Sequence, residues 1–129
     1  VFESTRSFFT NTIQPLKLQD ISEEEIVKNI LTTYTKLYDK YQADKVCIPE
    51  GNLIEVKFED FEQDALAMTE NIYSSLQLPG WDEAHTAIEQ YVNAKKGYKK
   101  NKYAYKPETV RLVNENWGRA IDDWGYERQ

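Results

Sequence analysis

Apolar residues recur at helical spacing over much of the chain, most regularly between residues 23 and 44. There they fall on one helical face, at Ile26, Val27, Ile30, Leu31, Tyr34, Leu37, Tyr38 and Tyr41. A helix with such a stripe buries that face against other elements. Ser22 and Glu25 stand where a capping box places its serine and its acid at the start of a helix. The pattern therefore predicts a helix over residues 23–44.

The same periodicity predicts four further helices. They cover residues 1–14, a stretch from Asp60 or Asp64 to residue 76, a stretch capped by Asp82 that runs to residue 94, and a stretch from residue 107 or 108 to residue 124. Pro15 ends the first of these helices, because proline cannot continue a helix. Pro107 suits the first position of the last one. We therefore expect a mostly helical chain.

Residues 53–58, Leu-Ile-Glu-Val-Lys-Phe, have a different pattern. The segment is short, contains β-branched residues and follows a Pro-Glu-Gly-Asn turn at residues 49–52. These features predict a strand. Because one strand cannot form a sheet, its partner strands are expected before residue 1. We therefore expect residues 1–129 to be a single segment of a longer domain, and the absence of an initiator Met agrees with this.

The charge is distributed unevenly. The net charge is −6, yet residues 95–106 contain six lysines and no acid, so the rest of the chain carries −12. An acidic chain is not expected to bind nucleic acid or a membrane surface. The apolar runs are also too short for a transmembrane helix. A single cysteine, Cys47, favours a reducing compartment, so we expect a cytoplasmic protein.

Several kinds of catalytic site find no support in the residues. His85 and Cys47 are the only histidine and cysteine and lie far apart without ligand spacing, so no metal site is predicted. A Ser-His-Asp triad would need His85, and neither a Gly-x-Ser-x-Gly elbow nor a Walker-type loop occurs. The acids between Glu55 and Asp64 are better explained as helix caps than as a catalytic pair. We therefore assign no catalytic residue in this chain.

The lysine segment is the strongest candidate for binding. Its ammonium groups surround Gly97 and alternate with Tyr98, Tyr103 and Tyr105. Such a segment can be a solvated surface loop or a receptor for a phosphate dianion, and composition alone favours neither. Ser4 likewise can cap a helix or donate to an anion near the start of the first helix.

Five short motifs occur in the order found in one enzyme family. Residues 1–5, Val-Phe-Glu-Ser-Thr, resemble the end of the sulfotransferase stretch Arg-Asn-Pro-x-x-Val-x-x-Ser. Residues 48–61 resemble the family's "gnl-ev-yEDl" strand, and residues 76–80 resemble its "LgLpg" turn. Residues 97–103 and 117–126 complete the pattern of bacterial members. The resemblance to the sulfotransferase family covers essentially the whole chain.

This resemblance implies an α/β fold with a parallel sheet, related to the P-loop nucleotide kinases. The chain would be its carboxy-terminal portion, mostly helical and with the one strand at 53–58. It also implies transfer of a sulfuryl group from 3'-phosphoadenosine 5'-phosphosulfate, the co-substrate, to a hydroxyl or amine. The acceptor would be a small molecule or a glycan, and no metal is implied.

The resemblance also implies which residues bind the donor. Ser4 matches the family serine that holds the 3'-phosphate, and Lys95, Lys96 and Gly97 resemble the family's Arg/Lys-Lys-Gly contact to the same phosphate. Phe58 stands where many members have the tyrosine of "YED", so its ring can pack in the adenine region without a hydroxyl.

Two parts of the family's machinery are missing from the sequence: the loop for the 5'-phosphosulfate and the upstream general base. Without them the leaving phosphate is not held and the acceptor proton is not removed, so we expect the 129 residues alone to be inactive. Two alternatives stay open. The chain could be a non-catalytic helical interaction module with an anion-binding basic loop, or an acidic domain whose basic loop binds another anionic partner.

Overall fold

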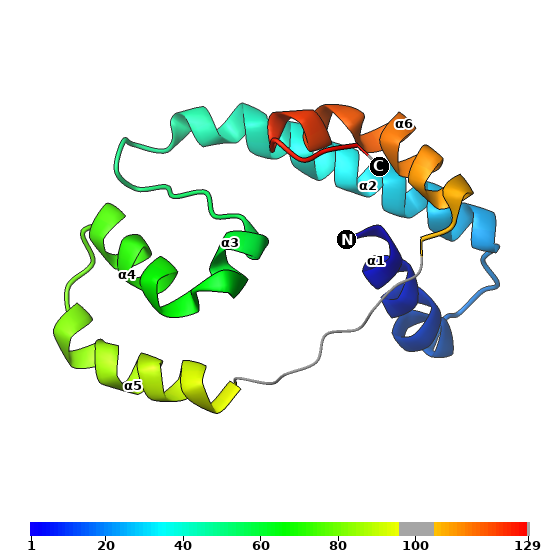
Figure 1. Cartoon of the computed structure of the whole chain (residues 1–129). Coiled ribbons are helices and arrows are strands. Elements are labelled where there is room, and N and C mark those ends of the chain that lie inside the picture. The colour runs from blue at the N-terminus through cyan, green and yellow to red at the C-terminus, as the bar shows by residue number, and fades with distance from the viewer. Residues whose placement is uncertain (96–104, 129) are drawn as a thin grey trace. The chain divides into compact units, whose positions relative to one another are not determined.

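The computed structural model describes residues 1–95 and 105–128 (Figure 1). By its internal contacts the chain divides into two units. The first unit comprises residues 1–45 and 102–129, and the second comprises residues 46–101. The two units are described separately below.

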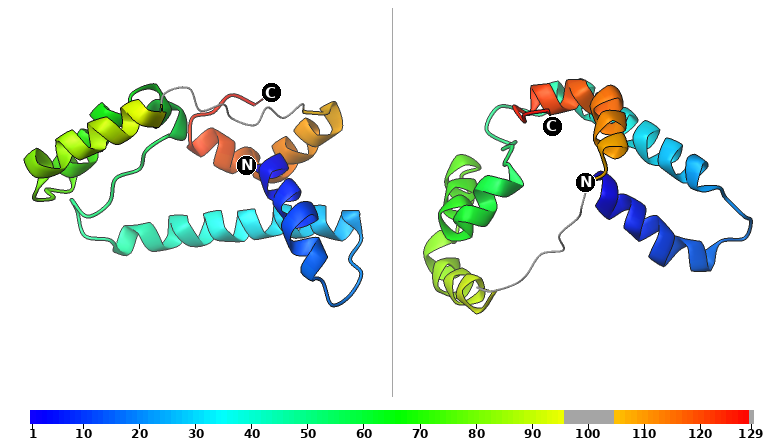
Figure 2. Two further views of the ribbon diagram at one scale, coloured as in Figure 1. Left: turned by 90° about the horizontal axis from the view of Figure 1, so that it is seen from below. Right: turned by 45° about the vertical axis from the view of Figure 1, so that its right-hand side comes forward.

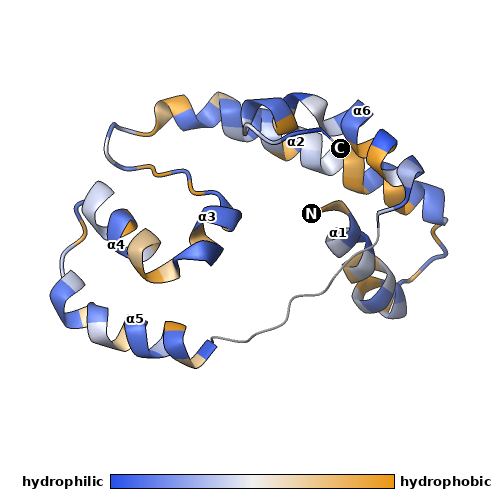
Figure 3. Ribbon diagram, viewed as in Figure 1, coloured by the Kyte–Doolittle hydropathy of each residue, from blue (hydrophilic) through white to orange (hydrophobic). Residues whose placement is uncertain are grey.

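The described residues of the first unit form three α-helices, α1 (Phe2–Phe8), α2 (Glu23–Asp44) and α6 (Pro107–Asp123). Both α1 and α6 pack against α2 (Figure 2). Their apolar residues alternate with hydrophilic ones along each helix, as the helical periodicity requires (Figure 3). The buried centre is a small cluster contributed by all three helices: Phe2, Ile26, Ile30, Leu31 and Trp117.

The capping box at the start of α2 is confirmed. The Glu25 amide donates to the Ser22 hydroxyl oxygen at 3.2 Å, and the Ser22 amide donates to the Glu25 carboxylate at 3.0 Å. The Ser22 amide, and then the Ser22 hydroxyl, which donates to the same carboxylate at 2.9 Å, lower the pKa of the Glu25 carboxyl. The helix begins at Glu23 and ends at Asp44, as its periodicity predicts. A short 3₁₀ turn, η3 (Lys45–Cys47), follows.

The first predicted helix is less regular than its sequence pattern indicates. α1 ends at Phe8, and the chain continues through a π-helical turn, η1 (Phe9–Ile13), and a 3₁₀ turn, η2 (Gln14–Leu16). Pro15 lies inside this last turn, where its missing N–H leaves no hydrogen bond unmade. The chain leaves the helical conformation only at Lys17, whose backbone is extended.

The second unit is built from α3 (Phe58–Gln63), α4 (Ala65–Ser75) and α5 (Trp81–Lys95). Asp64 separates the first two helices and caps α4 by accepting the Ala67 amide at 3.0 Å. The prediction that Asp82 caps the next helix is wrong, because α5 already begins at Trp81, directly after Gly80 with φ +85°. Both α3 and α5 pack against α4. Within residues 46–95 no side chain is buried.

The strand predicted at residues 53–58 is not found, and the described part of the chain contains no β-strand. Residues 53–57 have no regular secondary structure, and Phe58 is the first residue of α3. Lys57 is the N-cap of α3, and its φ of −75° and ψ of 137° are the non-helical backbone angles usual at that position. A strand is defined by hydrogen bonds to a neighbour, and the described residues provide no neighbouring strand.

Candidate functional site

Ser4 lies in α1, on a helix that is anchored by its neighbours. Phe2 is buried and packs edge-on against Trp117, with 5.9 Å between ring centroids. Arg6 pairs with Glu3 at 3.7 Å and with Glu23 of α2 at 3.3 Å. Ser4 itself is exposed. The first unit therefore fixes the backbone of Ser4 and leaves its side chain open to solvent.

Phe58 and Lys95 belong to the second unit. Phe58 begins α3 and its side chain is 61% exposed, which is unusual for a phenylalanine. Lys95 is the last residue of α5, and its ammonium lies 5.5 Å from the centroid of the Tyr91 ring. Both helices pack against α4. Lys96 and Gly97 lie outside the described residues.

Of the residues assigned from the sequence, therefore, Ser4 lies in one unit and Phe58 and Lys95 lie in the other. All three are exposed, so each is accessible to a ligand.

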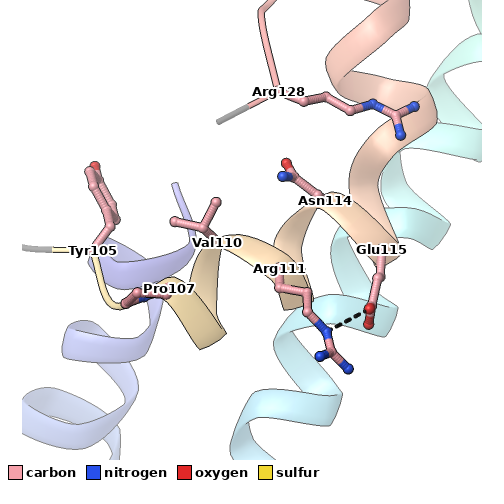
Figure 4. Close-up of a pocket in the computed structure, with 7 residues that line it drawn as sticks. All are labelled: Tyr105, Pro107, Val110, Arg111, Asn114, Glu115 and Arg128. Carbon is pink, nitrogen blue, oxygen red and sulfur yellow. Dashed lines mark hydrogen bonds and ion pairs between the residues drawn. The ribbon is translucent and has the colours of Figure 1, made fainter.

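A shallow depression on the first unit was not anticipated from the sequence (Figure 4). It has a volume of about 670 Å³ and is lined by Tyr105, Pro107, Val110, Arg111, Asn114, Glu115 and Arg128. Arg111 donates to Glu115 at 2.9 Å, and Arg128 donates to Asp122 at the same distance. Each guanidinium therefore already has a carboxylate beside it, which makes this depression a weak attractor for an anion. The sequence analysis touched this depression only through Tyr105, near the end of the lysine segment, and Pro107, which follows that segment.

A second polar cluster joins α2 to α6 beside a cavity of about 90 Å³. The Tyr38 hydroxyl donates to the Asp123 carboxylate, and Arg119 donates to Asp39 at 2.8 Å. The Arg119 guanidinium also lies over the Tyr38 ring, 5.3 Å from its centroid. Burial, and then the Asp123 carboxylate, raises the pKa of the Tyr38 hydroxyl. Tyr38 is therefore held in its protonated form and links the two helices instead of accepting protons.

Other kinds of site find little support. Across residues 1–95 and 105–128, no group of three histidine, cysteine, aspartate or glutamate side chains is placed to hold a metal ion. Among the described helices, none is both long and apolar enough to cross a lipid bilayer. Cys47 is exposed and is not part of a disulfide.

Comparison with known proteins gives two related findings. Over 111 residues, the chain is 27% identical to the omega-hydroxy-beta-dihydromenaquinone-9 sulfotransferases of Mycobacterium bovis and Mycobacterium tuberculosis. These alignments cover 86% of this chain and 29% of each relative, so the chain spans less than a third of the length of the curated relatives it matches. No solved structure is significantly similar.

The family comparison is the stronger finding. The model of the sulfotransferase family matches residues 1–83, a range that includes Ser4 and Phe58 and ends in the first turn of α5. This is well over half of the chain, and it covers the first three of the five short motifs. The chain belongs to the sulfotransferase family.

Proposed function

We propose that the protein containing this chain transfers a sulfuryl group from 3'-phosphoadenosine 5'-phosphosulfate to a hydroxyl or amine. The family match over residues 1–83 carries the proposal. The similarity to two sulfotransferases along 86% of the chain supports it further.

We assign the chain to one part of the donor site, the part that contacts adenosine and its 3'-phosphate. Ser4 would donate its hydroxyl to the 3'-phosphate, and Lys95 and Lys96 would supply ammonium groups to the same dianion. Gly97 would let the backbone approach it closely. Phe58 would pack against the adenine. The exposure of Ser4, Phe58 and Lys95 supports this assignment, because a binding group has to reach its ligand.

For the acceptor we propose the hydroxyl of a small molecule. The curated relatives are named for a hydroxylated dihydromenaquinone, so this branch of the family includes an enzyme that acts on a small-molecule hydroxyl. A glycan or an amine would be the alternative acceptor.

We also propose that residues 1–129 form the carboxy-terminal part of a larger α/β domain in which residues 53–57 pair with a neighbouring strand. The absence of buried side chains in residues 46–95 supports this, because it leaves room for additional packing.

The proposal is tested by Lys95→Ala combined with Lys96→Ala in the full-length protein. Each charge-assisted contact to phosphate contributes roughly 1.5 to 3 kcal/mol. Calorimetry should therefore show adenosine 3',5'-bisphosphate binding at least about tenfold more weakly, since about 1.4 kcal/mol corresponds to a factor of ten. Adenosine 5'-phosphate, which lacks the 3'-phosphate, should bind nearly as before.

Lys28→Ala combined with Lys36→Ala is the matched control, because it removes two exposed lysines from α2 and changes the net charge equally. This control should not alter the affinity for either nucleotide. Equal losses for both nucleotides, or no loss for either, would remove Lys95 and Lys96 from the donor site.

A further inference from the structure

Tyr91 and Lys95 form an exposed pair on α5. They are four residues apart and therefore lie on the same side of the helix. The Tyr91 side chain is 65% exposed although its ring is large and apolar. The Lys95 ammonium lies 5.5 Å from the centroid of this ring, within the range of a cation–π interaction. Nothing in the core explains Tyr91, since it contributes to no buried cluster.

We propose that Tyr91 is a positioning residue for the donor site: its ring holds the Lys95 ammonium where it receives the 3'-phosphate of the nucleotide. This inference rests on the proposed function, in which Lys95 contacts that phosphate. Nothing in the family motifs assigns a role to Tyr91.

The direction of the Lys95 side chain determines where its positive charge lies relative to the end of α5. Lys95 ends α5, and the carboxyl end of a helix carries partial negative charge on its free carbonyls. A phosphate bound at that end would be repelled. Side chains of a helix lean toward its amino end, so the ammonium of Lys95 can lie over the ring one turn earlier. The Tyr91 ring thereby keeps the positive charge at the flank of α5, away from the terminal carbonyls.

The surroundings on α5 leave the ammonium available to an anion. The helix positions three or four residues before Tyr91 and Lys95 hold Ala87, Ile88, Tyr91 and Val92, and none of these is acidic. Among the residues that the structure describes, no carboxylate forms an ion pair with Lys95. The interaction with Tyr91 orders the ammonium without neutralising it, because an aromatic ring carries no net charge.

The test is a double-mutant cycle in the full-length protein, with the affinity for adenosine 3',5'-bisphosphate measured by calorimetry. Tyr91→Leu removes the ring, and we expect binding to weaken about two- to fivefold, the size of one exposed cation–π interaction. Tyr91→Phe keeps the ring and should bind like the wild type. In a Lys95→Ala background Tyr91→Leu should have no further effect, because the ammonium that it positions is gone.

Gln90→Leu is the matched control, since it places an exposed leucine on another side of α5 and should not change the affinity. If Lys95→Ala leaves the affinity unchanged, the placement of Lys95 in the donor site fails. If Lys95→Ala weakens binding while Tyr91→Leu does not, only the role of Tyr91 fails. Equal effects of Tyr91→Leu with and without Lys95, or a loss in Tyr91→Phe, would also overturn the positioning role.

Discussion

The indole N–H of Trp117 in α6 donates a hydrogen bond to the backbone carbonyl oxygen of Leu31 in α2, with 3.1 Å between the two atoms. Both residues are buried, so water does not compete for this bond. The same indole packs against Phe2 of α1 and lies 4.0 Å from the Tyr34 ring, measured between centroids. Trp117 is therefore the residue at which the three helices of the first unit meet.

Replacing Trp117 with Phe should lower the free energy of unfolding by about 1 to 3 kcal/mol. The change removes a hydrogen bond with a net contribution of about 1 kcal/mol and part of a buried ring system. Urea denaturation followed by circular dichroism measures the loss. Trp81→Phe is the control. Trp81 lies in the second unit and is only partly buried, so replacing it should lower the free energy of unfolding by less. If Trp117→Phe lowered the free energy of unfolding less than Trp81→Phe, Trp117 would not be the residue that holds the core of the first unit together.

Gly118 and Arg128 provide a second prediction. A Cβ at Gly118 would lie 2.9 Å from the Arg128 guanidinium carbon, so Gly118→Ala should displace that side chain. Arg128 lowers the pKa of the Asp122 carboxyl by hydrogen bonding, and displacement should raise this pKa toward its ordinary value of 3.8. NMR titration of the Asp122 carboxyl measures the shift.

The free energy of unfolding should stay the same or rise by up to about 1 kcal/mol in Gly118→Ala. Alanine favours a helix by about 1 kcal/mol over glycine, and an exposed ion pair contributes little. Arg128→Gln should raise the Asp122 pKa in the same way without altering the helix. An unchanged Asp122 pKa in Gly118→Ala would show that Arg128 accommodates the methyl group without leaving its partner.

Local signals in the sequence were sufficient for part of the fold. Ser22 and Glu25 predict the start of α2 because a capping box needs only residues three apart. The bond from Trp117 to Leu31 joins residues 86 apart, and no periodicity reveals such a pair. The strand predicted at 53–58 is not found in the described residues: its residue types favour an extended backbone, but a strand also needs hydrogen bonds to a neighbour.

The residues of the candidate site were predicted mainly from the family motifs and less from local sequence signals. Ser4, with its small exposed side chain, has no periodicity or charge pattern that distinguishes it from a helix cap, and only the resemblance assigns it to a phosphate. Lys95 was predicted by charge and by resemblance together. Tyr91 emerged only from the structure, because its significance lies in its exposure and in the position of the Lys95 ammonium.

The capping box of α2 should make the stability of the first unit depend on pH. The Ser22 amide and hydroxyl lower the pKa of Glu25 in the folded protein below its ordinary value of 4.5. A depressed carboxyl pKa stabilises the fold above the unfolded pKa, and this contribution disappears as pH falls through the folded value. The wild type should therefore lose stability below pH 4.5 more steeply than Glu25→Gln.

Urea denaturation at a series of pH values measures how steeply the free energy of unfolding depends on pH in the wild type and in Glu25→Gln. Glu24→Gln, which changes a neighbouring exposed acid outside the capping box, should keep the slope of the wild type. Parallel curves for the wild type and Glu25→Gln would show that the Glu25 carboxylate does not stabilise α2.

Finally, backbone amides of the two units should exchange with solvent at different rates. The buried cluster of Phe2, Ile26, Ile30, Leu31 and Trp117 belongs entirely to the first unit, whereas residues 46–95 contain no buried side chain. Regions with few buried apolar contacts open locally at low free-energy cost. In the 129-residue chain, hydrogen exchange measured by mass spectrometry should therefore be slower in α2 and α6 than in α4 and α5. Trp117→Phe should speed exchange in α2 and α6 and have less effect on α4 and α5, which contribute nothing to that cluster. Equal protection of all four helices in the wild type would mean that the core around Trp117 does not determine where the chain is most stable.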